Sequence, residues 1–119
     1  MEQIKIGQLA RRTRTGDGSV AILAVGKMLA DAQKAAEQLH TSGIDATVWD
    51  VRSCVPLDPA MIADAAAHGA VLTVEDGIRE GGIGMTIADQ VHAVNATVPV
   101  HVLGLPARFI PQGSAERIL

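Results

Sequence analysis

The residues best suited to chemistry lie in segment 74–84, which reads Val-Glu-Asp-Gly-Ile-Arg-Glu-Gly-Gly-Ile-Gly. The segment leaves a predicted strand and enters a predicted helix, which is where open α/β sheets place their ligand crevices. Free N–H groups at such a helix start can bind phosphate. The carboxylates of Glu75, Asp76 and Glu80 would repel an anion, however, and only Arg79 offsets them. We therefore expect a glycine-rich turn that lets helix and strand pack closely.

Two other glycine motifs match nucleotide-binding sequences only in part. Gly82 and Gly84 lack the third glycine of a dinucleotide fingerprint, because Ile87 stands in its place. The motif Gly26-Lys27-Met28 has neither the leading glycines nor the Ser/Thr of a Walker A loop. Both motifs therefore predict structural turns.

The motif Gly16-Asp17-Gly18 resembles the start of the thiamine diphosphate motif, in which an Asp and a later Asn ligate magnesium. The only asparagine of this chain is Asn95, which lies far along the sequence near a predicted helix end. The motif is not completed, so we expect a turn here as well.

The histidines and the single cysteine do not form a recognisable site. His40 and His68 fall in the last turns of predicted helices, where the helix dipole favours a cation; His92 and His101 are spaced too irregularly for a metal motif. Cys54 alone cannot form an internal disulfide or a cysteine-based metal site. The residues thus predict a domain without catalytic, cofactor-binding or metal-ligating residues of its own.

The amino-acid composition limits the classes of protein to which the chain can belong. With 119 residues, 48% of them hydrophobic and 19% charged, the chain is the size of one globular domain. Its net charge of −3 and its two aromatic residues, Trp49 and Phe109, disfavour nucleic-acid binding. No apolar run approaches the length of a membrane span and the first residues lack a signal core, so the sequence predicts a cytoplasmic location without membrane contact.

Strand-like and helical segments alternate along the chain. A continuous apolar run at residues 19–25 is typical of a strand buried on both faces. Further strands are predicted at residues 45–51, 70–74 and 98–103, with helices at 28–41, 58–68 and 83–94. This alternation predicts a three-layer α/β domain with a largely parallel sheet, and Pro99 suggests an edge position for the last strand. Residues 4–14 also have strand character, and the turn at residues 16–18 would make them a hairpin partner of strand 19–25.

The end of the sequence predicts an incomplete helix. Ser114 is a good N-cap, but only five residues follow it, whereas an isolated helix needs about 12–15. We therefore expect residues 1–119 to be a single domain excised from a larger enzyme and truncated in its last helix.

The order of these segments resembles the C-terminal domain shared by transketolases and the β-type subunits of 2-oxoacid dehydrogenases. The matching stretches are residues 20–26, 43–48, 51–58, 74–77 and 81–84. Within that superfamily, the tail at residues 104–114 is similar to that of 1-deoxy-D-xylulose-5-phosphate synthases. The resemblance implies a five-stranded, mostly parallel sheet in an α/β/α sandwich, with the first strand antiparallel at one edge. It would pair residues near 6–13 with strand 46–51 and overrule the hairpin.

The resemblance also implies a function for the parent enzyme. Such a transferase condenses pyruvate with D-glyceraldehyde 3-phosphate, releasing carbon dioxide, to supply isoprenoid biosynthesis. Thiamine diphosphate and magnesium would be bound by the other domains, and this domain would contribute to packing and to a homodimer while being inactive alone. Interdomain candidates are Glu75, Arg79, Gly81, Gly82, Gly84 and Arg108. The alternatives are the same domain of a transketolase or a 2-oxoacid dehydrogenase β-subunit, and a free-standing α/β interaction or ligand-binding module.

Overall fold

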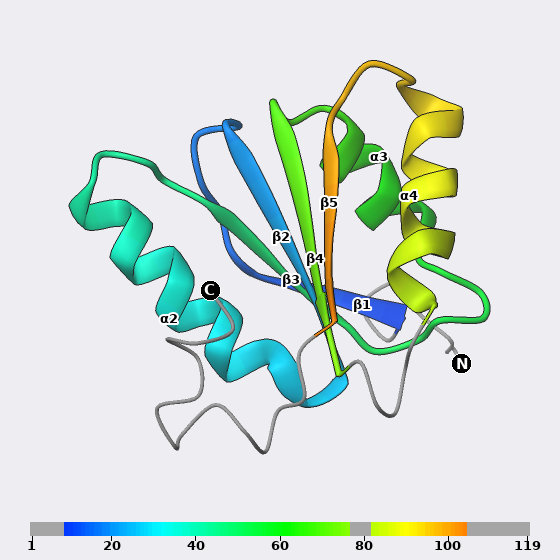
Figure 1. The fold of residues 1–119 in the computed structure, drawn as a ribbon, viewed down its shortest axis with the longest axis horizontal. Helices are drawn as coiled ribbons and strands as arrows, with labels where there is room; N and C mark the ends of the chain where they lie inside the picture. Colours follow the sequence, from blue (N-terminus) through cyan, green and yellow to red (C-terminus); the bar gives the residue numbers. More distant parts are fainter. Residues whose placement is uncertain (1–8, 77–81, 105–119) are drawn as a thin grey trace.

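The structure, a computed structural model, describes residues 9–76 and 82–104. Its strands are β1 (Ala10–Arg14), β2 (Val20–Val25), β3 (Thr47–Val51), β4 (Ala70–Glu75) and β5 (Val100–Gly104). Its helices are a short 3-10 turn η1 (Gly26–Met28), α2 (Leu29–Thr41), α3 (Pro59–Ala66) and α4 (Ile83–Val94). The strands form one sheet in the order β1-β3-β2-β4-β5 (Figure 1). No helix among the described residues is long and apolar enough to cross a membrane.

The central strand β2 is buried because it has parallel neighbours on both sides and helices on both faces. It pairs with β3 along residues 21–25 and with β4 along residues 20–24. Residues 21–25 are at most 1% exposed. The continuous apolar run therefore predicted this strand and its environment correctly.

The hairpin expected between β1 and β2 is wrong. β1 instead pairs antiparallel with β3, with Ala10 opposite Val51 and Arg12 opposite Trp49. The connection from β1 to β2 crosses the start of β3, where the Asp17 N–H donates to the Asp45 carbonyl at 2.9 Å. Because β3 and β4 already take both sides of β2, β1 can pair only at the outer side of β3. The antiparallel edge strand implied by the family resemblance is confirmed.

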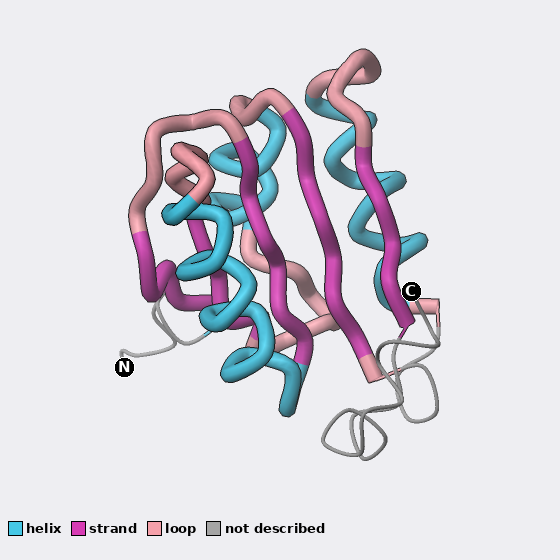
Figure 2. The backbone as a smooth tube through the Cα atoms, turned by 60° about the vertical axis from the view of Figure 1, so that its left-hand side comes forward, coloured by secondary structure: helices cyan, strands magenta, loops and turns pink. Residues whose placement is uncertain are grey.

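The helices cover the two faces of the sheet, as Figures 1 and 2 show. α2 packs on one face with a core of Ile22, Ala24, Met28, Ala32, Ala36, Val48 and Val74. α3 and α4 pack on the other face with Leu23, Val25, Trp49, Met61, Ala65, Val71, Ile87 and Val91. The predicted three-layer α/β/α sandwich is thus confirmed, and the carboxyl ends of β2, β3, β4 and β5 lie along one edge of the sheet.

The helix ends follow the signals in the sequence. Asp58 is the N-cap of α3, since its side chain accepts a hydrogen bond from the Ala60 N–H at 2.8 Å, and Pro59 opens the helix. α2 has His40 in its last turn, and Gly43 beyond it has a φ of +88°. Glycine adopts this left-handed conformation without strain, which explains the stop.

Candidate functional site

Two helices begin at the carboxyl ends of the parallel strands, which we call the carboxyl edge of the sheet. Each helix has a buried carboxylate beside its first turn. Asp58 precedes α3 and is fully buried, while Glu75 ends β4 and is 4% exposed. α3 and α4 pack side by side on the same face of the sheet. This edge is where an α/β domain would hold a ligand, so the local contacts of these two side chains decide what it can bind.

Glu75 closes the amino end of α4. Its Oε1 accepts a hydrogen bond from the Gly84 N–H at 2.5 Å, and its Oε2 accepts one from the Gly82 N–H at 3.3 Å. The negative charge also lies at the positive end of the α4 dipole, which stabilises both. Two of the N–H groups at this helix start, those of Gly82 and Gly84, are therefore already bound to a carboxylate of the chain itself.

The glycines of this turn allow the close packing that we expected. Gly82, the N-cap of α4, has a φ of +98°. A Cβ on Gly84 would overlap the Val102 side chain and come within 2.8 Å of Thr73 Oγ1 and 2.9 Å of Glu75 Oε1. Gly84 therefore lets α4 approach β4 and β5 closely enough for Glu75 to reach the helix start.

The sequence-predicted interdomain residues are only partly described by the structure. Glu75, Gly82 and Gly84 come together in this capping turn, whereas Arg79, Gly81 and Arg108 lie outside the described residues, as does the predicted helix after Ser114. In the described part of the chain, no group of three or more His, Cys, Asp or Glu side chains could hold a metal ion.

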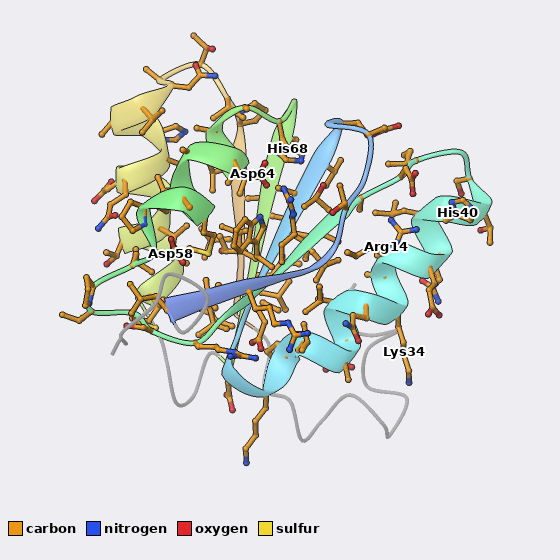
Figure 3. The ribbon with its side chains drawn as sticks, turned by 180° about the vertical axis from the view of Figure 1, so that it is seen from behind. Arg14, Lys34, His40, Asp58, Asp64 and His68 are labelled. Carbon is orange, nitrogen blue, oxygen red and sulfur yellow. The ribbon has the colours of Figure 1, made fainter. Side chains whose placement is uncertain are left out.

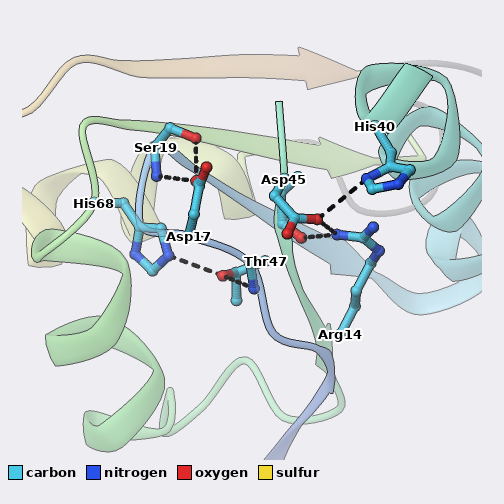
Figure 4. Close-up of polar contacts among 9 residues, drawn as sticks. Arg14, Asp17, Ser19, His40, Asp45, Thr47 and His68 are labelled. Carbon is cyan, nitrogen blue, oxygen red and sulfur yellow. Dashed lines mark hydrogen bonds and ion pairs between the residues drawn. The ribbon is translucent and has the colours of Figure 1, made fainter. Parts of the chain in front are cut away.

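At the opposite end of the sheet, where the parallel strands begin, a polar network is centred on His68 (Figure 4). His68 Nδ1 lies 2.7 Å from the Asp64 carbonyl, which can only accept, so Nδ1 carries the proton. Nε2 lies 3.0 Å from Thr47 Oγ1, and this hydroxyl also accepts from the Gly16 N–H at 2.9 Å. In the neutral ring the Thr47 hydroxyl donates to Nε2. The network ties the end of α3 to β3 and to the β1–β2 connection.

The structure corrects the expectation for His68. It lies beyond α3, which ends at Ala66, and is only 8% exposed. Figure 3 shows it at the end of α3 opposite Asp58. It is therefore a buried, hydrogen-bonded residue just beyond the helix and not a residue of its last turn. Its partner Thr47 lies on β3, 21 residues away in the sequence, and could not have been found from local sequence.

The thiamine-like motif at residues 16–18 forms a turn, as the sequence predicts. Asp17 Oδ1 accepts hydrogen bonds from the Ser19 hydroxyl at 2.5 Å and the Ser19 N–H at 3.0 Å, and these bonds lower the pKa of Asp17. The amide of Asn95 donates to the Ala66 carbonyl and accepts from Thr97. The residues that the motif would use for magnesium are thus engaged in local turns and do not fit the cofactor.

Two ionic clusters anchor β1, and neither was predicted from the sequence. Asp64 accepts the indole N–H of Trp49 at 2.8 Å and lies 3.6 Å from Arg12, whose guanidinium is 5.8 Å from the Trp49 ring centroid. Arg14 lies 2.9 Å from Asp45 Oδ1 and donates to the Ala46 carbonyl at 2.6 Å. Each cluster joins β1 to segments distant in sequence, so Arg12 and Arg14 have structural partners.

The sequence matches known proteins over nearly its whole length. The model of the transketolase C-terminal domain family matches residues 9–119. Similar curated proteins include the 1-deoxy-D-xylulose-5-phosphate synthase of Methylibium petroleiphilum, 39% identical over 95% of this chain, and that of Thermobifida fusca, 34% identical over 100% of it. This chain spans only 17% and 19% of those two proteins.

A solved structure gives the same result for the fold. It is described as a split-gene transketolase, an inactive β4 tetramer, and is 31% identical to this chain with a TM-score of 0.69. The match covers 85% of this chain and 33% of that one. On these sequence and structural matches, the chain belongs to the transketolase C-terminal domain family.

Proposed function

We propose that the chain is the C-terminal domain of a 1-deoxy-D-xylulose-5-phosphate synthase. The parent enzyme would condense pyruvate with D-glyceraldehyde 3-phosphate and release carbon dioxide. The observation that carries this assignment is the similarity of nearly the whole chain to synthases of that name, at 34–39% identity in three organisms. The tail at residues 104–114 resembles the same enzymes. The cytoplasmic location and the homodimer implied by the resemblance are part of this proposal.

Within that enzyme, we assign the domain a structural role. The carboxylate of Glu75 accepts hydrogen bonds at the start of α4, and the carboxylate of Asp58 caps the start of α3. Both helix starts at the carboxyl edge therefore have a negative charge where a pyrophosphate would need a positive one. Thiamine diphosphate and magnesium would be bound by other parts of the parent.

Surface-exposed apolar residues are consistent with contacts to those parts. Val55, in the loop between β3 and α3, is 90% exposed, and Met85, in the first turn of α4, is 62% exposed. Burying such side chains against another domain would be favourable. The similar split-gene transketolase is described as an inactive β4 tetramer, and the match covers 33% of its chain. That description agrees with the proposal that this domain is inactive alone.

Thermal unfolding of the 119-residue chain, with and without thiamine diphosphate and magnesium, tests the structural role. A protein that binds a ligand only when folded is stabilised by it. We expect the melting temperature to stay unchanged, while the complete Methylibium petroleiphilum synthase, as a positive control, melts at a higher temperature with the cofactor. A rise of several degrees for the isolated chain would show a cofactor site here and contradict the assigned role.

A further inference from the structure

We draw no further inference here: the strongest candidate, the apolar outer surface of α3 and of the loop before it, where Val55, Pro59, Ala60 and Ala63 are exposed, belongs to the domain contacts already proposed, and nothing in the structure shows what covers it.

Discussion

Removing the carboxylate of Glu75 should destabilise the domain through the start of α4. In the variant Glu75→Ala, the buried Gly84 N–H loses its acceptor, which lies at 2.5 Å, and the Gly82 N–H loses one at 3.3 Å. An unsatisfied buried donor costs about 1–3 kcal/mol. Loss of the charge at the helix start adds about 0.3–1 kcal/mol. We therefore expect a loss of about 3 kcal/mol in the free energy of unfolding, taking the middle to upper part of these ranges.

Urea unfolding measures this loss. Small proteins have m-values of about 1–3 kcal/mol/M, so the midpoint should fall by about 1–3 M in Glu75→Ala. Glu75→Gln retains an oxygen that can accept from Gly84 and should lose about half as much. Amide hydrogen exchange should be faster at Gly84 and at Thr86, whose N–H bonds to the Gly82 carbonyl in the first turn of α4.

Asp89→Asn, which removes an exposed carboxylate from the same helix, is the matched control and should change stability by less than about 0.5 kcal/mol. The reasoning would be refuted if Glu75→Ala were no less stable than Asp89→Asn. It would also be refuted if the stability fell while exchange at Gly84 stayed at the wild-type rate.

Two further predictions concern the connection between β1 and β2. Gly16→Ala should lower the free energy of unfolding by about 3 kcal/mol, because the new Cβ would overlap the backbone of Asp45 and Ala46. Gly18 has a φ of +94° and open space around it, so Gly18→Ala should lower it by only about 1–2 kcal/mol. Urea unfolding measures both losses, and equal losses would contradict this difference. The bonds from Ser19 lower the pKa of Asp17 in the folded state, so they stabilise the protein above the unfolded pKa of about 4 and are lost as the pH falls through the folded value. The stability difference between wild type and Asp17→Asn should therefore be largest at neutral pH and disappear in acid, and a difference that grows in acid would contradict the assignment.

Local signals in the sequence were sufficient for most of the secondary structure. The apolar run at β2 and the Asp58-Pro59 start of α3 each depend on neighbouring residues, so the sequence shows them directly. The antiparallel position of β1 could not be derived in this way. It depends on the contact of the residue 15–19 connection with Asp45, and only the family resemblance indicated it.

The candidate site was predictable only as a turn. The spacing of glycines indicated close packing, which Gly84 confirms, but not that Glu75 would reach across the turn to the helix start. From the sequence, we expected the carboxylate of Glu75 to repel a bound anion. In the structure, this carboxylate itself accepts the hydrogen bonds at the helix start that an anion would accept. His68 was misplaced for a related reason, since its partner Thr47 lies on β3, 21 residues away in the sequence.

The most direct test of the account is an assay of the native polypeptide that contains residues 1–119. It should release carbon dioxide from pyruvate only when D-glyceraldehyde 3-phosphate, thiamine diphosphate and magnesium are all present, and form 1-deoxy-D-xylulose 5-phosphate. A polypeptide that instead transfers a two-carbon unit between sugar phosphates, or that has no thiamine-dependent activity, would contradict the assignment to a synthase.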